Sequence, residues 1–418
     1  MKTGKTHYMI SVAAVIGAEL LLIAWLIHMK FEPAWMAVMI ALSLAGCAIH
    51  IRAAALEPRY LLKVIGAEHA GQKRIAQLDH LRVIAVSGVI LTHVIQVDLE
   101  SYKAPALYGA NILWVLTLAA NVIYVMLSGA LLYRPKKESL RKFYLRRFSA
   151  VVVPLSMYYL WYTAVNYHLG RGWDWVSLQS VPHWILANEM REAPHFWLIY
   201  VILSLYVTVP LFRLVFSSAR WKDFTKALFA IFLFSVLSLV LLPYAELAVK
   251  LQITGWLLVS LFGYWVCREE TRKYDRLLIA LGLISAIVLG IVSVAAPDVD
   301  FMDTYFLNDK PVTILFCLGI FAAVYHFRGF FSRSNPVTAV ISRYSYGIML
   351  IHWWSLHFVV RARLSISSMS FHYLGILVSL VLVVLISLLF CVIADNLLVM
   401  PVQKVFDVII GKLDNRQI

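Results

Sequence analysis

Charged residues are scarce in this sequence. Only 14% of its 418 residues are charged, and 61% are apolar. Soluble proteins carry about 25% charged and about 45–50% apolar residues. A soluble fold of this length cannot bury so much apolar surface, so lipid has to cover part of it. The composition therefore excludes an ordinary soluble protein and predicts one that is embedded in a membrane.

Cysteine is also rare, with only four residues: Cys47, Cys267, Cys317 and Cys391. All four lie inside or at the ends of apolar runs, and no two have C-x-x-C spacing, so we expect neither a disulfide framework nor a zinc site. The sequence also lacks an internal repeat, a low-complexity tract and an appended soluble domain. We therefore assign any chemistry to the membrane bundle, without a metal or a permanently bound cofactor.

The first apolar run resembles a secretory signal at its start but not at its end. Lys2 and Lys5 precede it, and it extends from about Tyr8 to Ile27. The polar residues 28–33 follow where a small-x-small cleavage site would stand, and a second apolar run comes next. We expect the first run to be a retained membrane span.

Long apolar runs dominate the rest of the chain. A helix needs about 20 mostly apolar residues to cross a membrane. Twelve runs qualify, starting near positions 8, 34, 81, 111, 147, 195, 226, 251, 277, 311, 343 and 373. The last continues to about Met400, which is too long for a straight span and predicts a tilt or a break.

The predicted fold class is all-α: a polytopic membrane bundle of about twelve helices. We divide it into residues 1–75, with two extra spans and a basic loop, residues 76–400, a ten-helix domain, and a short tail at 401–418. Basic residues mark the cytoplasmic side of membrane proteins. With the N-terminus inside, most of the 37 Lys and Arg residues fall in inner segments. We therefore expect both termini in the cytoplasm, and the net charge of +14 needs no nucleic acid.

Two predicted loops differ from the others. The inner stretch 134–147 is the densest basic run of the chain, and the outer stretch 166–194 is the longest external loop and is rich in Trp and His.

The third run contains a polar pair at helical spacing. It opens with Leu-Asp-His-Leu-Arg, ending at Arg82, and reaches His93 eleven residues later. Eleven residues are close to three helical turns, or about 16 Å, so both side chains face the same way. A titratable side chain near the middle of a membrane is costly and often functional, and imidazole suits a general base. A histidine satisfied by a neighbouring helix and an interfacial arginine explain the same pattern without chemistry.

An Arg, ten residues and a His, introduced by Leu-Asp-x-Leu-Arg, resemble the signature of the membrane acyltransferase-3 family. Its members O-acylate cell-envelope glycans and related acceptors. Four further pieces follow in the family's order: the Ser-Gly step at 127–129, the basic segment at 143–147, the His-x-Trp segment at 195–198, and Ser-x-Gly-Ile-x-x-x-His at 345–352. The resemblance covers about residues 76–400.

The resemblance implies that an acyl group, commonly acetyl, moves from cytoplasmic acyl-coenzyme A to a hydroxyl of a cell-envelope glycan or lipid-linked sugar. It places the protein in a bacterial inner membrane, with lipid, acyl-coenzyme A and the acceptor as partners. His93 would be the general base or a covalent acyl carrier. Arg82 would orient the donor or stabilise developing negative charge. Asp79, three residues before Arg82 on the same face, would hold its guanidinium.

Other candidates belong to the donor and acceptor sites. Cations that would bind the phosphates of the donor are Arg141, Lys142, Arg146 and Arg147, although positive-inside topology alone explains such a run. Candidates for the substrate site are His352, His195, Trp197, Ser128 and Tyr346. For His352 simple packing is the alternative, and for His195 it is a place in the interfacial belt of aromatic residues.

The sequence departs from the family pattern at three places. The first two spans are extra, Ser149 and Ala150 stand where a further Arg is common, and Ile199 and Tyr200 follow the His-x-Trp segment where many members have Glu. With these departures, the sequence resembles the branch of enterobacterial-antigen and adhesin-type acetyltransferases. The alternative class is a transporter or exporter of a glycan or small metabolite, which would favour internal repeats and paired broken helices.

Overall fold

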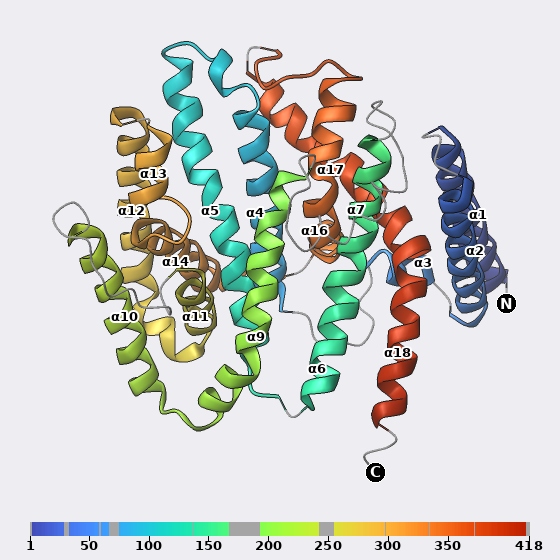
Figure 1. Cartoon of the computed structure of the whole chain (residues 1–418), viewed down its shortest axis with the longest axis horizontal. Helices are drawn as coiled ribbons and strands as arrows, with labels where there is room; N and C mark the ends of the chain where they lie inside the picture. The colour runs from blue at the N-terminus through green and yellow to red at the C-terminus, as the bar shows by residue number, and fades with distance from the viewer. Residues whose placement is uncertain are drawn as a thin grey trace.

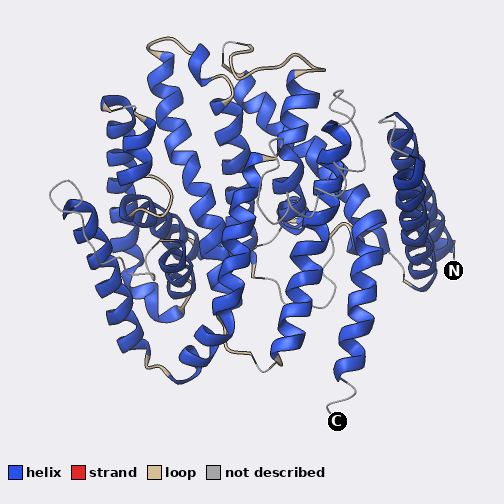
Figure 2. Cartoon of the chain, viewed as in Figure 1, coloured by secondary structure: helices blue, strands red, loops and turns tan. Residues whose placement is uncertain are grey.

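The computed structural model describes residues 2–28, 33–57, 60–66, 75–136, 138–166, 193–241, 255–296, 298–333, 335–371 and 373–414. All regular structure in these ranges is helical, as Figure 2 shows. The predicted all-α class is confirmed. Most of the predicted outer loop 166–194 lies outside the described residues.

The helices form one bundle, with α1 and α2 at its edge (Figure 1). Their bounds are α1 Lys2–His28, α2 Pro33–Leu56, α3 Tyr60–Val64, α4 Ala76–Gln96, α5 Ala106–Leu132, α6 Leu140–Arg147, α7 Val153–Asn166, α9 Trp197–Ser218, α10 Trp221–Leu241, α11 Trp256–Val266, α12 Asp275–Ala295, α13 Val299–Tyr305, α14 Pro311–His326, α15 Arg328–Phe331, α16 Pro336–Trp354, α17 Gly375–Ala394 and α18 Met400–Asp414.

Within the described ranges, eight helical segments are long and apolar enough to cross a membrane. Two more helices, α11 and α14, are apolar but have only 11 and 16 residues. The chain is therefore a multi-pass membrane protein. The number of twelve crossings and the cytoplasmic placement of both termini stay predictions.

The relative direction of α4 and α16 follows from two pairs of contacts. Arg82 of α4 reaches Ser342 of α16, and His93 reaches His352 further along the same two helices. The residue numbers increase along both helices from the first contact to the second, so the two helices run in the same direction. This agrees with the predicted alternation of spans, in which both helices start on the same side of the membrane.

The long final apolar run forms one continuous helical segment, Gly375–Lys412, that changes type on the way. A π-helical turn at Asp395–Val399 joins α17 to α18. The hydroxyl of Tyr158, in α7, donates a hydrogen bond to Asp395 at 3.0 Å at the start of this turn. The π-helical turn therefore coincides with a polar contact between helices that are far apart in sequence, and a tilt or break of the span stays a prediction. The extra N-terminal helices pack against this π-helical turn, because Gly46 of α2 lies against the backbone of Leu397.

Helices α5 and α11 approach so closely that only glycine fits between them. A Cβ at Gly129 would overlap the backbone of Ser260, and one at Gly263 would overlap the backbone of Met126. Small residues let membrane helices pack backbone against backbone. The Ser-Gly step at 128–129 therefore has a packing role, whatever else it does.

Replacing Gly129 with Ala is expected to destabilise the protein by about 1–3 kcal/mol, because the added methyl group forces the two helices apart. Gly109→Ala in the same helix is the matched control, since a Cβ there meets no described atom within 4 Å. Thermal unfolding of both variants in detergent measures the difference. Equal midpoints would contradict the close contact.

Candidate active site

Three polar side chains join α4 and α16 at one level of the bundle. The carboxylate of Asp79, only 2% exposed, accepts hydrogen bonds from Arg82 at 2.8 Å and from the Ser342 hydroxyl at 2.6 Å. Arg82 also donates to the Ser342 hydroxyl at 3.3 Å. The expected contact between Asp79 and Arg82 is present, and Ser342 completes it from a helix that sequence spacing does not connect to α4.

Further along the same two helices, His352 fixes how His93 presents its ring. The His352 Nδ1 lies 2.6 Å from the carbonyl oxygen of Met349, and its Nε2 lies 2.8 Å from the Nδ1 of His93. A carbonyl oxygen only accepts, so we assign the proton of His352 to Nδ1, and its Nε2 then accepts from His93. His93 consequently carries its proton on Nδ1 and an available lone pair on Nε2.

His195 belongs to the same cluster. A 3-10 turn, Pro194–Phe196, precedes α9 and places its ring 4.7 Å from that of His352 and 6.3 Å from that of His93, centroid to centroid. Its Nε2 donates to the carbonyl oxygen of Leu350 at 3.0 Å. It is 6% exposed, and its Nδ1 has no hydrogen-bond partner among the described residues. The burial of His195 and its ring contacts favour a place in the histidine cluster over one in the interfacial belt, and its role in the substrate site stays a prediction.

Helix α4 ends at Gln96, three residues after His93, whereas the helix that contains His352 continues beyond α16 as a π-helical stretch, Ser355–Arg361. The depth of both histidines in a membrane stays a prediction. π-Helical turns are frequent at functional sites.

An internal cavity of about 240 Å³ lies beside this seam. Its lining includes three predicted site residues, Arg82, Ser128 and Tyr346, together with Tyr206 and Met349. The cavity extends from Arg82 to Met349, and neither His93 nor His352 is among its lining residues. Trp197 is not part of this lining, and its ring centroid lies 5.5 Å from that of Trp256 in α11, with the ring planes tilted by 53°.

The four predicted phosphate-binding cations do not form one cluster. The guanidinium of Arg147 lies 5.9 Å from the ring centroid of Tyr206, which lines the internal cavity. Arg146 instead donates to Glu138 at 2.9 Å. Arg141 is exposed, and the backbone N–H of Lys142 donates to the hydroxyl of Ser139, which caps α6. Adjacent residues of a helix point about 100° apart, which separates Arg146 from Arg147.

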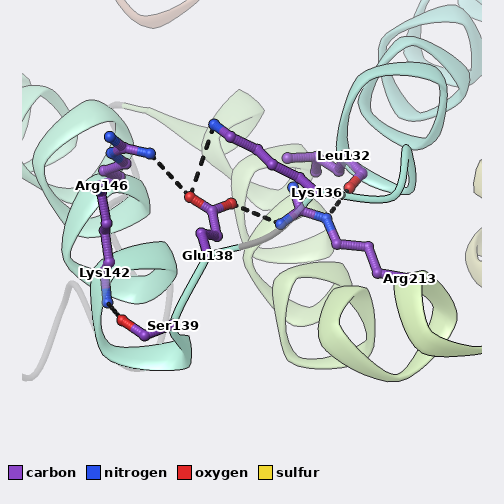
Figure 3. A network of polar contacts seen from close by, with 7 residues as sticks. All are labelled: Leu132, Lys136, Glu138, Ser139, Lys142, Arg146 and Arg213. Atoms are coloured by element: carbon purple, nitrogen blue, oxygen red, sulfur yellow. Dashed lines mark hydrogen bonds and ion pairs between the residues drawn. The ribbon is translucent and has the colours of Figure 1, made fainter. Parts of the chain in front are cut away.

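Glu138 contacts three cations, Lys136, Arg146 and Arg213, on the side of α6 away from Arg147 (Figure 3). Its carboxylate accepts from Arg213 of α9 at 2.6 Å and from Arg146, and it lies 3.7 Å from Lys136. Burial raises the pKa of this carboxyl, but hydrogen bonds and charge from Arg213, Lys136 and Arg146 outweigh it and hold the pKa below its ordinary value. Sequence reasoning missed Glu138, although it is the one acidic residue in the basic stretch 134–147.

The family model described as an acyltransferase domain, acyltransferase-3, matches residues 75–395. The chain belongs to the acyltransferase-3 family. It is thus an integral membrane acyltransferase, and the bundle described above contains its domain. No curated protein matches the chain. No solved structure matches it either.

Proposed function

We propose that this acyltransferase-3 protein moves an acyl group, acetyl in the simplest case, from cytoplasmic acyl-coenzyme A to a hydroxyl of a cell-envelope glycan or lipid-linked sugar. His93 is the proposed general base. The observation that carries the proposal is the hydrogen-bonded series from Met349 through His352 to His93, which leaves the Nε2 lone pair of His93 available.

In this mechanism, the hydroxyl oxygen of the acceptor attacks the carbonyl carbon of the thioester while His93 Nε2 accepts the hydroxyl proton. The carbon–sulfur bond then breaks, and the coenzyme A sulfur leaves with that proton, which His93 returns from Nε2. His352 accepts the hydrogen bond from His93 Nδ1 throughout and stabilises the transient imidazolium. A covalent route, in which Nε2 itself attacks the thioester and passes the acyl group on, uses the same lone pair.

Arg82 lines the internal cavity and is proposed to orient the acyl donor there, because it lies about 16 Å from His93 along α4 and is too far to reach the thioester oxygen beside that base. Asp79 acts as a positioning residue, because its buried carboxylate holds the guanidinium through one hydrogen bond at 2.8 Å. Tyr346, Ser128 and Tyr206 surround the same space and are proposed to contact the acyl donor.

The direct test is transfer of labelled acetyl from acetyl-coenzyme A into membrane glycan, by membranes that contain the protein and by matched membranes that lack it. Label that appears only with the protein supports acyl transfer. A transporter would instead move labelled glycan or metabolite across vesicles without acylating it, and that result would replace the proposal.

Replacing His352 with Leu is expected to lower kcat by about 10²-fold, because His93 loses the acceptor that selects its tautomer. His352→Gln keeps an acceptor oxygen near the position of Nε2 and should retain more activity. The KM for acetyl-coenzyme A should stay close to that of the wild type in both variants. Equal losses in the two variants would show that His352 acts through packing alone.

A further inference from the structure

Three cations surround a single carboxylate at the predicted cytoplasmic end of α5, α6 and α9. Glu138 contacts Lys136, Arg146 and Arg213, and its side chain is only 6% exposed (Figure 3). One negative charge faces three positive charges, so this cluster keeps a local excess of two. Guanidinium groups bind carboxylate and phosphate with the same forked geometry. The cluster is therefore suited to a further anion.

A cavity opens directly onto these charges. It has a volume of about 560 Å³, and its lining includes Lys136, Glu138, Phe143, Pro210 and Arg213. The Arg213 guanidinium lies 4.9 Å from the ring centroid of Phe143 and also donates through Nε to the carbonyl oxygen of Leu132 at 2.7 Å. These contacts hold Arg213 at the wall of the cavity even when no ligand is present.

The basic cavity and the internal cavity follow one face of α9. Tyr206 lines the internal cavity, whereas Pro210 and Arg213 line the basic one. Their spacing of four and then three residues places them on the same side of the helix, and seven residues span about 10 Å. An elongated donor can therefore lie along α9 with its ends in different cavities.

Arg147 lines neither cavity but lies close to one lining residue of each. Its guanidinium is 5.9 Å from the ring centroids of both Phe143 and Tyr206. Its Nε is buried and has no hydrogen-bond partner within the described part of the chain. A buried donor without a partner is costly, and a polar group of a ligand that passes between the cavities would satisfy it.

We propose that the basic cavity binds the phosphorylated nucleotide end of the acyl donor through its lining residues Arg213 and Lys136, and that Glu138, which Arg146 also holds, occupies the anion position until a donor phosphate displaces it. This rests on the proposed function, because it assumes that acyl-coenzyme A is the donor. Glu138 then serves as an internal substitute for phosphate, which keeps the cations folded inward between turnovers.

Binding of coenzyme A and of pantetheine, which lacks the nucleotide and phosphates, to the purified full chain in detergent tests this proposal. Arg213→Gln is expected to weaken coenzyme A binding by about tenfold or more, because charge-assisted hydrogen bonds are lost, and to leave pantetheine binding unchanged. Glu138→Gln should tighten coenzyme A binding by about fivefold, since no carboxylate has to be displaced. Arg213→Lys keeps the charge without the fork and should weaken binding less than Arg213→Gln.

Arg220→Gln is the matched control, because Arg220 is an exposed residue just after α9 that pairs with the exposed Asp223. It should bind both ligands as the wild type does. Unchanged pantetheine binding by each variant shows that it is folded. If Glu138→Gln weakens coenzyme A as much as Arg213→Gln does, displacement is overturned. If the Arg213 variants bind coenzyme A within twofold of wild type while acetyl transfer persists, the basic cavity is not the donor site and the proposed function stands.

Discussion

Replacing His93 with Gln is expected to lower kcat for acyl transfer by about 10²- to 10⁴-fold, the contribution of a well-placed general base. Glutamine can still donate a hydrogen bond toward His352, but it has no basic lone pair. Initial rates of labelled acetyl transfer at matched protein levels measure the loss. The same prediction covers the covalent route, because both mechanisms need the Nε2 of His93.

His80→Gln is the control for this substitution. His80 lies on the same helix, and its Nε2 is 3.2 Å from the carbonyl oxygen of Arg333, away from the histidine cluster. It should transfer acetyl at close to the wild-type rate. A His93→Gln rate within twofold of wild type, or an equal loss in His80→Gln, would remove His93 from the chemistry.

Replacing Asp79 with Ala is expected to reduce the free energy of unfolding by about 1–3 kcal/mol, because the Arg82 guanidinium, whose side chain is 28% exposed, loses the carboxylate to which it donates at 2.8 Å. The substitution also removes the acceptor of the Ser342 hydroxyl. Activity should fall with stability, since Arg82 loses its orientation at the cavity. Unfolding in detergent, followed by the loss of folded protein with temperature or denaturant, measures the first effect.

The double variant Asp79→Leu/Arg82→Met separates the two effects. Replacing a buried ion pair with apolar residues of similar size is often neutral or stabilising, so we expect it to recover stability but not activity. The exposed pair Arg220–Asp223 provides a comparison, because breaking such a surface pair costs at most about 1 kcal/mol. Recovery of activity in the double variant would exclude Arg82 from the mechanism.

Sequence periodicity predicts which side chains share one face of a helix, and α4 shows this for three residues. Asp79 and Arg82 are neighbours because they are three residues apart on α4. Arg82 and His93 both face α16 because eleven residues complete about three turns. The all-α class follows from the apolar runs, but their number alone does not establish how many of them cross the membrane.

Contacts between helices are outside the reach of periodicity. The pairing of His93 with His352 joins residues 259 positions apart, and His195 reaches this pair from a third helix. Composition at an interface suggests a lipid-facing ring for His195, whereas tertiary packing buries it. Periodicity also does not predict how the basic stretch 134–147 divides. Its residues are close in sequence, but α6 directs Arg146 and Arg147 to different sides, and only some of the cations contact Glu138.

The order in which the ribosome delivers α4 and α16 has a consequence for when the protein becomes active. His93 is synthesised early, but the residues that select its tautomer, Met349 and His352, emerge more than 250 residues later. A nascent chain that already carries α4 and the basic stretch 134–147 therefore lacks the partner that fixes this tautomer. On the proposed mechanism, the basic nitrogen of His93 is specified only once the late helix has inserted beside the early one.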